Sequence, residues 1–305
     1  PEEARDSFGE DPFEVKNILK YWVLSEKQEF HVIPTDTINI HIDKDALLRS
    51  GIMLPKTIRH LKGEDLKDAI PDKLYIPLTD IRMLTKVDLL MLEMLANCNW
   101  ERPLYLAISV GSVSKLKFDN YFVQEGLAFR FTPFDYKKWG DVGENRLYAV
   151  DVERLYDNVM NRYKYGGLDT PGLYLDETTL RTCWYHRRLF AQLAKELIAQ
   201  GDNERAKKVL AYAEQVIPGY NVPETHESGS YDIATAYAAL GEKTKAVTLA
   251  VHLIAEAEDY INWAFSLKGN RIEMVRNDCI YKFWQWNQYN ELLKKIDGEK
   301  YKESN

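Results

Sequence analysis

The feature that most constrains this 305-residue chain is a helical pattern that occurs twice within residues 177–260. In each copy, large and small apolar residues recur at helical spacing, and a glycine follows the first helix, Gly201 in one copy and Gly241 in the other. Glycine accepts the positive φ of a residue after a helix at the lowest cost. Because Ala206 and Ala246 are small, they leave room for two helices to cross closely. The pattern therefore predicts two antiparallel helical hairpins.

The spacing within these hairpins resembles the 34-residue tetratricopeptide repeat when Arg187 is taken as the first position. The second copy lies 40 residues after the first and has Glu258 where the first has Pro218. Alanine-rich antiparallel hairpins of any kind are the alternative. Tetratricopeptide-like repeats bind other chains or brace a neighbouring domain, and they rarely carry chemistry themselves.

The N-terminal half alternates short strand-like and helix-like segments, which predicts a small α/β domain with a mixed sheet. A helix is expected after Thr85, an N-cap residue followed three positions later by Asp88. The mainly apolar segment 104–110 is expected to be a central strand covered on both faces, and residues 134–143 a surface loop. Strands are expected at residues 30–43, 73–78, 104–110, 121–123, 126–131 and 147–150.

A dense run of glycine, aspartate and proline at residues 165–172 interrupts regular structure and predicts a domain boundary. The expected fold class is therefore α+β. An α/β domain is expected over residues 1–165 and an all-helical, tetratricopeptide-like domain over residues 166–305.

Within segment 30–43, isoleucines alternate with polar residues, which is typical of a strand with one buried face. The opposite face carries Thr37, Asn39, His41 and Asp43. We expect this polar face to be solvated, and a face that binds a sugar or a peptide is the alternative.

The net charge of −7, without a basic stripe, argues against nucleic acid as a partner. The sequence has no apolar run of about 18 residues, the length typical of a membrane span. It begins with Pro1 rather than methionine, so we expect a piece of a longer protein.

No pattern in the sequence predicts a catalytic residue, a metal ion or a cofactor. It has no nucleophile elbow, phosphate-binding loop or dinucleotide fingerprint, and its six histidines show no i, i+4 pairing. The cysteines, Cys98, Cys183 and Cys279, are too few and too dispersed for a disulfide framework. We expect them to be buried as small hydrophobic residues.

Three clusters of polar and aromatic residues are candidate ligand or domain-interface sites. The first combines Asn99, Trp100, Arg102 and Tyr105 at an expected joint between a helix and a strand. Strand ends of α/β sheets often hold ligands. The structural alternative buries Trp100 in the core and pairs Arg102 with a carboxylate.

The second cluster is Glu125 and Arg130. Residues five positions apart in one strand point to opposite faces. A joint site would therefore require a turn at Gly126.

The third cluster begins at Asp176 and Glu177, which suit the N-terminus of the helix that follows. It continues to Arg181 and Arg188. We expect these arginines to pair with carboxylates of the α/β domain and so fix the two domains together, with ligand binding as the alternative.

A last helix, expected at residues 273–295, has aromatic residues on more than one face, among them Trp284, Trp286 and Tyr289. A helix that is apolar on several sides is usually buried, so we expect it to cap the repeats. As a docking face, it would meet a partner protein or a membrane surface.

Three ordered motifs resemble those of a known family. Residues 97–105 resemble its stretch of asparagine, tryptophan, Arg-Pro and tyrosine, residues 125–130 its Glu-Gly-Leu-Ala-x-Arg stretch, and residues 174–177 its Tyr-Leu-Asp-Glu stretch. The family comprises bacterial multi-pass membrane glycosyltransferases related to protein O-mannosyltransferases. The resemblance extends over nearly the whole chain.

This resemblance implies a region that follows the last membrane span and lies on the periplasmic face of the inner membrane. The family's expected chemistry moves a sugar from a lipid-linked donor to a protein hydroxyl, with its carboxylates in the membrane half. The implied role is a non-catalytic accessory domain that binds or orients the acceptor protein, or braces the membrane-embedded half of the same chain. The alternatives are a free-standing carbohydrate-active enzyme with Arg102, Glu125 and Arg130 in its cleft, and a repeat-type scaffold protein.

Overall fold

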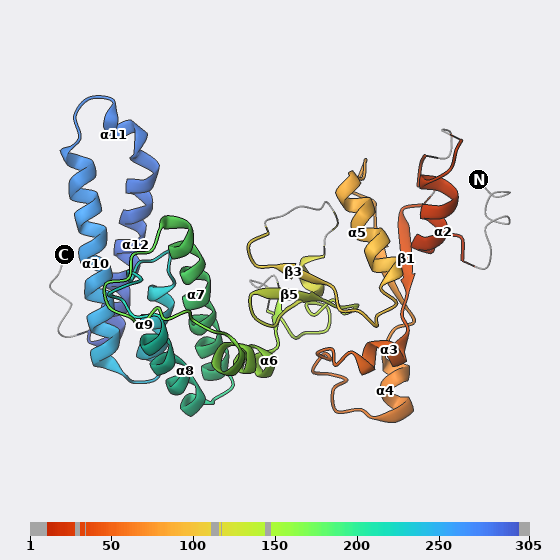
Figure 1. The fold of residues 1–305 in the computed structure, drawn as a ribbon, viewed down its shortest axis with the longest axis horizontal. Coiled ribbons are helices and arrows are strands. Elements are labelled where there is room, and N and C mark those ends of the chain that lie inside the picture. The colour runs from red at the N-terminus through yellow and green to blue at the C-terminus, as the bar shows by residue number, and fades with distance from the viewer. Residues whose placement is uncertain are drawn as a thin grey trace. The chain divides into compact units, whose positions relative to one another are not determined.

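The computed structural model describes residues 11–27, 31–33, 35–110, 116, 118–143 and 148–298. The chain forms two compact units, Pro1–Asp151 and Val152–Asn305, which we call the sheet domain and the helical domain (Figure 1). The predicted α+β fold class is confirmed, because strands in mixed pairing come first and a helical region follows. Of the helices that the structure describes, none combines the length and the apolar character of a membrane span.

The division between the domains falls earlier than the boundary expected at residues 165/166. The helix α6 (Val152–Asp157) and the π-helix η4 (Asn158–Arg162) belong to the helical domain. They do so because α6 packs against the first long helix of that domain and because Leu155 and Val159 are buried.

The sheet domain contains a two-stranded and a four-stranded sheet among its described residues. Its elements in chain order are α2 (Val15–Ile18), the π-helix η1 (Leu19–Val23), β1 (Thr37–His41), α3 (Lys44–Arg49), α4 (Gly63–Ala69), β2 (Lys73–Pro77), α5 (Lys86–Asn97), β3 (Tyr105–Ala107), the 3-10 helix η3 (Asp119–Tyr121), β4 (Phe122–Gln124), β5 (Ala128–Phe131) and β6 (Ala149–Val150).

The strands β1 and β2 pair antiparallel, with Ile38 opposite Ile76. Their alternating isoleucines enter the core, as predicted from the period of two. The expectation of a solvated polar face is wrong at Asn39, which is buried. The N-terminal segment covers this residue, because the Asn39 N–H donates to the Phe13 carbonyl oxygen at 3.0 Å and Glu14 forms a bridge beside it.

The four-stranded sheet has the order β3-β5-β4-β6, with β4 and β6 parallel and the other pairs antiparallel. The expectation that residues 104–110 form a central strand is wrong, because β3 lies at the edge of the sheet. Its residues Tyr105 and Ala107 are exposed. An apolar run alone therefore did not distinguish an edge strand from a central one.

Residues 134–143, expected to be a surface loop, contribute to the core instead. Phe134 and Tyr136 are fully buried, and the rings of Phe134 and Trp139 meet edge to face. The Tyr136 hydroxyl donates to the Met53 carbonyl oxygen, and burial raises the pKa of Tyr136 above its usual value. These aromatic side chains contact residues far away in the sequence, so their burial has no local signature.

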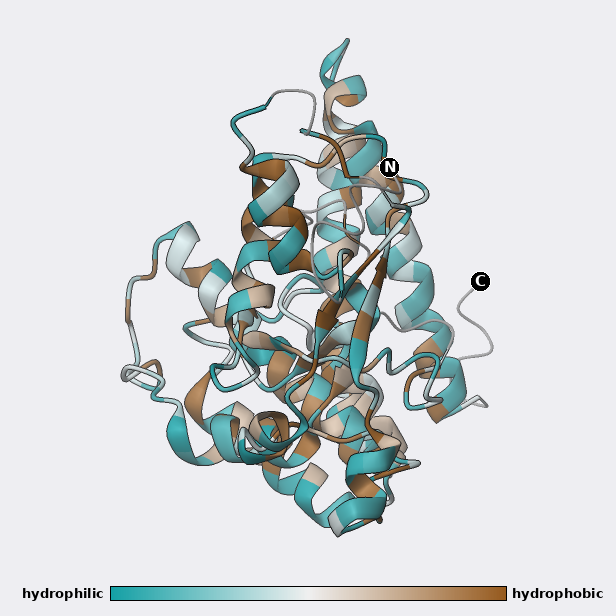
Figure 2. Cartoon of the chain, turned by 90° about the vertical axis from the view of Figure 1, so that its right-hand side faces the viewer, coloured by the Kyte–Doolittle hydropathy of each residue, from teal (hydrophilic) through white to brown (hydrophobic). Residues whose placement is uncertain are grey.

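The helix α5 begins as predicted. Thr85 is its N-cap, and a complete capping box joins Thr85 to Asp88. The helix buries Leu92 and Leu95 against the core. The helices carry both polar and apolar stretches along their length (Figure 2), as expected of elements with one face in a core.

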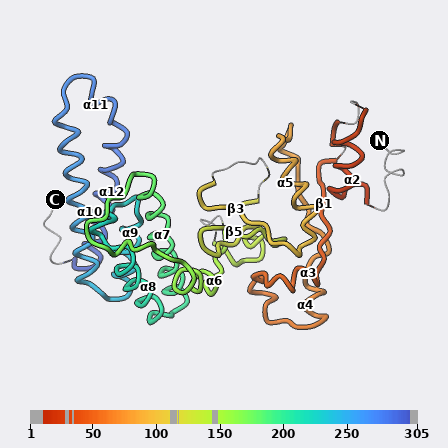
Figure 3. The backbone as a smooth tube through the Cα atoms, viewed as in Figure 1, coloured from red at the N-terminus to blue at the C-terminus, as the bar shows by residue number. Residues whose placement is uncertain are grey.

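The helical domain is formed by successive hairpins, which Figure 3 traces along the chain. Gly201 has φ 80° and Gly241 has φ 76°, as predicted for residues that follow a helix. Ala206 and Ala246 are fully buried. After α6 and η4, its elements are α7 (Glu177–Ala199), α8 (Asn203–Val216), α9 (Ser230–Ala239), α10 (Lys243–Ser266), α11 (Arg271–Met274) and α12 (Arg276–Ile296).

The two predicted hairpins are α7 with α8 and α9 with α10, and α7 also packs against α9. The last helix, α12, packs along α10 through one face, and its other sides include exposed aromatic residues. The buried residues of this face are Lys282, Gln285, Tyr289, Leu292 and Leu293.

Candidate binding site

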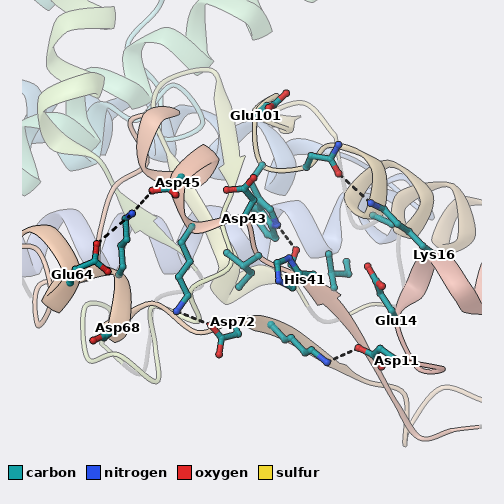
Figure 4. Close-up of a pocket in the computed structure, with 18 residues that line it drawn as sticks. Asp11, Glu14, Lys16, His41, Asp43, Asp45, Glu64, Asp68, Asp72 and Glu101 are labelled. Atoms are coloured by element: carbon teal, nitrogen blue, oxygen red, sulfur yellow. Dashed lines mark hydrogen bonds and ion pairs between the residues drawn. The ribbon is translucent and has the colours of Figure 1, made fainter. Parts of the chain in front are cut away.

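A polar cavity of about 770 Å³ lies in the sheet domain (Figure 4). It forms where the N-terminal segment, the end of β1, the start of α3, α4, the start of β2 and the end of α5 come together. The lining residues are Asp11, Glu14, Lys16, Ile40, His41, Ile42, Asp43, Lys44, Asp45, Glu64, Lys67, Asp68, Asp72, Lys73, Ala96, Asn99, Trp100 and Glu101.

Two of the predicted site residues, Asn99 and Trp100, lie at this cavity directly after α5. Both have positive φ, 48° and 62°, although neither is glycine. Such a backbone costs about 1–2 kcal/mol per residue and persists only where the surroundings hold it. The buried Trp100 is held by its indole N–H, which donates to the His41 carbonyl oxygen at 2.8 Å. This bond joins the end of α5 to the end of β1.

The Asn99 side chain forms part of the polar lining of the cavity. Its Oδ1 accepts a hydrogen bond from Lys16 Nζ at 3.2 Å. On the neighbouring wall, the Asp43 carboxylate is the N-cap of α3 and accepts from the Ala46 N–H at 2.9 Å. Of the polar residues of segment 30–43 considered as a sugar- or peptide-binding face, His41 and Asp43 line the cavity.

Eight carboxylates and four lysines line the cavity, so its charge is negative at neutral pH. Lys44 pairs with Asp72 at 2.7 Å and Lys67 with Asp45 at 2.8 Å. Each lysine donates a hydrogen bond to its partner, which lowers the pKa of the Asp72 and Asp45 carboxyl groups below the usual value.

The arrangement suits recognition of polar groups. Carboxylate and amide oxygens accept hydrogen bonds from hydroxyl, amide and ammonium groups, and the excess of negative charge favours a cationic or hydroxyl-rich ligand. Among the residues that the structure describes, no group of three or more His, Cys, Asp or Glu side chains is placed to hold a metal ion.

Three of the other residues of the first two clusters, Tyr105, Glu125 and Arg130, meet in a separate network in which Glu125 and Arg130 are buried. The chain reverses at Gly126, because β4 and β5 form a hairpin in which the Glu125 N–H donates to the Ala128 carbonyl oxygen. This turn puts Glu125 and Arg130 on the same face, with Glu125 Oε1 at 3.6 Å from Arg130 Nη1. The Tyr105 hydroxyl donates to Glu125 Oε2 at 2.8 Å.

The Arg130 guanidinium also fixes a distant turn of the chain. Its Nη2 donates to the Ser50 hydroxyl at 2.7 Å and to the Ser50 carbonyl oxygen at 3.0 Å. A crevice shared by Trp100, Arg102 and Arg130 has a volume of only about 10 Å³, which suits at most one water molecule. The hydrogen bonds of Arg130 thus join β5 to the segment that follows α3. Arg102 is exposed at the edge of this crevice.

The third predicted cluster is local to one helix end. Asp176 is the N-cap of α7 and accepts from the Thr178 and Thr179 N–H groups, and Glu177 pairs with Arg181 at 2.6 Å on the same exposed helix. The Arg188 side chain donates to the Glu227 carbonyl oxygen. The contacts described for these arginines lie within the helical domain.

The three aromatic residues of α12 have different surroundings. Tyr289 is fully buried and its hydroxyl is 2.9 Å from His226 Nδ1. The Trp286 indole N–H donates to Glu258 Oε1 at 2.9 Å. Trp284 is half exposed, so only this one of the three lies largely at the surface.

Arg187 lies beside Arg188 of the third cluster in the sequence and was not among the predicted site residues. It is buried in α7 beside a groove of about 280 Å³ between the hairpins. Its guanidinium donates to four oxygen atoms of the α8–α9 connection, those of the Ile217, Val222 and Pro223 carbonyls and the Ser228 hydroxyl. An arginine on a helix has no sequence signature that reveals carbonyl partners.

The cysteines are only partly as expected. Cys183 is buried, whereas Cys98 and Cys279 are half-buried. All three are free thiols. Burial raises the pKa of the Cys183 and Cys98 thiols above the usual value.

The sheet domain matches a known family model. Residues 4–153 match TMEM260-associated domain 2, and TMEM260 is a protein O-mannosyltransferase-related family. The match spans almost the whole sheet domain, including every residue that lines the polar cavity, and is consistent in outline with the resemblance found in the sequence. No curated protein and no solved structure matches the chain.

Proposed function

We propose that this chain is an extracytoplasmic accessory region of a membrane glycosyltransferase related to the protein O-mannosyltransferases. The observation that carries the proposal is the match of residues 4–153 to TMEM260-associated domain 2. In this proposal the chain follows the membrane-embedded half of the same polypeptide and faces the periplasm. The sugar transfer itself takes place in that other half.

The sheet domain, in this proposal, binds a segment of the acceptor protein in the polar cavity. Two observations support this role. The cavity lies wholly within the matched residues, and its wall is rich in hydrogen-bond acceptors. Acceptor segments offer serine and threonine hydroxyls and backbone amides, and basic side chains would be attracted by the surplus carboxylates. Binding of this kind holds the acceptor near the membrane half and lowers the entropic cost of the encounter.

The gene provides the first test. Reading the coding sequence upstream of Pro1 is expected to reveal a series of hydrophobic spans. A start codon directly before Pro1 would end the proposal that the chain belongs to a membrane enzyme.

The second test uses the full-length enzyme in native membranes. We expect the double charge reversal Asp68→Lys with Glu101→Lys to lower sugar transfer to protein acceptors at least about fivefold, because both exposed carboxylates line the cavity. Asp65→Lys is the matched control, since Asp65 is exposed on the same helix α4 but does not line the cavity.

Glycopeptide mass spectrometry measures the transfer, and immunoblotting of the membranes checks that the variants are equally abundant. Equal transfer by the double variant and the wild type would exclude the cavity as the acceptor site. A loss that Asp65→Lys reproduces would assign the effect to overall charge.

A further inference from the structure

The far end of the hairpin formed by α10 and α12 exposes large apolar side chains to solvent. Figure 1 shows these two helices running side by side beyond α9, with α11 at their tip. The exposed fractions are 62% for Phe265, 84% for Met274, 58% for Ile280, 44% for Phe283 and 50% for Trp284.

These side chains form a shared surface. Ile280, Phe283 and Trp284 occupy positions i, i+3 and i+4 of α12 and therefore lie on one side of that helix. The Phe265 ring of α10 meets the Phe283 ring edge to face, with 6.1 Å between the ring centroids. The surface thus extends across both helices.

Packing inside the domain does not explain this surface. Phe283 meets the Phe265 ring and Trp284 meets the His226 ring edge to face, yet both stay about half exposed. The buried face of α12 consists of other residues, which include Lys282, Gln285 and Tyr289. Clustered exposed apolar side chains usually mark a contact with another molecule.

The charges around the tip identify the partner by complementarity. Lys268, Arg271 and Arg276 are exposed at the tip. Two exposed acidic residues lie among them, Glu273, which pairs with Arg276 at 3.7 Å, and Asp278 in the first turn of α12. This local excess of positive charge contrasts with the net charge of −7 of the whole chain. Cations beside exposed aromatic and aliphatic residues are the combination that binds the interface of an anionic lipid bilayer.

We propose that the tip of the α10–α12 hairpin docks on an anionic phospholipid surface. Phe265, Ile280 and Phe283 enter the boundary between headgroups and acyl chains, and Lys268 and Arg271 contact the lipid phosphates. The binding is peripheral, by the tip of a folded domain. It is a property of this chain alone and does not require the proposed role in glycosylation.

Vesicle co-sedimentation of the 305-residue chain tests the proposal. We expect binding to vesicles that contain phosphatidylglycerol, weaker binding to pure phosphatidylcholine, and a decrease as salt is added. The double variant Phe265→Ser with Phe283→Ser is expected to lower the partition coefficient at least about tenfold. Lys268→Glu with Arg271→Glu is expected to lower binding to the anionic vesicles by a similar factor and to weaken the salt dependence.

The matched control is Leu24→Ser with Tyr174→Ser, which removes two exposed apolar side chains elsewhere. It is expected to bind like the wild type, and circular dichroism checks that every variant keeps its helix content. Failure of the wild-type chain to bind anionic vesicles, or equal binding by the wild type and the phenylalanine variant, would overturn the proposal. A wild-type dimer that the phenylalanine variant dissociates, without vesicle binding, would assign the surface to a second copy instead.

Discussion

Each domain contains a buried arginine, and the two differ in how the charge is balanced. Arg130 of the sheet domain is 2% exposed, and Arg187 of the helical domain is 3% exposed. Arg130 lies 3.6 Å from the Glu125 carboxylate. Within the described residues, Arg187 has no carboxylate at ion-pair distance, and its hydrogen bonds go to three carbonyl oxygens and the Ser228 hydroxyl.

The difference shows two ways of fixing an irregular segment. In the sheet domain, an ion pair at the end of a hairpin holds the turn at Ser50, which is far away in the sequence. In the helical domain, one guanidinium replaces the hydrogen bonds that the α8–α9 connection would otherwise make with water. Burial lowers the pKa of Arg187 to about 10, so this arginine is still charged at neutral pH. Carbonyl dipoles, with the more distant Glu224 carboxylate, therefore supply the compensation that Glu125 gives Arg130.

The largest expected effect comes from removing Arg187. Arg187→Ala leaves four oxygen atoms without their donor, and we expect a loss of about 3–5 kcal/mol in the free energy of unfolding of the helical domain. Urea unfolding followed by circular dichroism measures it. Arg181→Ala is the control, because Arg181 forms an exposed pair on the same helix and should cost less than about 0.5 kcal/mol. A loss below about 1 kcal/mol for Arg187→Ala would mean that the loop does not depend on this arginine.

A smaller effect is expected at the ion pair of the sheet domain. A double-mutant cycle with Glu125→Gln and Arg130→Met should give a coupling free energy of about 1–3 kcal/mol, since the two side chains are in contact and buried. Glutamine keeps an acceptor for the Tyr105 hydroxyl, so the cycle isolates the charge. Urea unfolding of the four proteins provides the values. A coupling near zero would remove the distinction between the two arginines, because Glu125 would then not balance Arg130.

The helical domain was largely predictable because its contacts are local. Gly201 and Gly241 mark helix ends by their conformational freedom alone, and both have the positive φ expected. Ala206 and Ala246 predicted close helix crossings, and both are fully buried. A hairpin joins neighbouring segments, so periodicity carries most of the information needed.

The sheet domain was less predictable because its burial depends on distant segments. Tyr136 is buried through contact with Met53, and β3 is an edge strand because of the order in which the strands pair. The same limit applies to the cavity. Asn99 and Trp100 were singled out as a possible site, but Lys67 and Asp72, which share the cavity with them, come from segments without any motif. Only the tertiary fold brings these side chains together.

The smallest expected effect is on the pH dependence of the stability of the helical domain. His186 is expected to contribute to this dependence, whereas its neighbour Arg187 is not. The His186 ring lies edge-on to the Tyr163 and Tyr165 rings, at centroid distances of 5.7 and 5.4 Å. Its buried Nδ1 has no hydrogen-bond partner among the residues that the structure describes. Burial lowers the pKa of His186 below 6.5. Below pH 6.5 the unfolded chain therefore binds more protons at this residue than the folded chain does, and the stability of the helical domain falls as the pH falls.

Arg187 stays charged throughout this range, so it adds nothing to the dependence. We expect thermal melts between pH 7.5 and pH 5.5 to show a smaller loss of stability for His186→Phe than for the wild type, because phenylalanine keeps the ring packing without a titrating group. The remaining dependence is expected from His226, whose pKa burial also lowers. His252→Phe, at an exposed position, should behave like the wild type. If His186→Phe and the wild type lose stability equally as the pH falls, the stability of this domain does not depend on the protonation of His186.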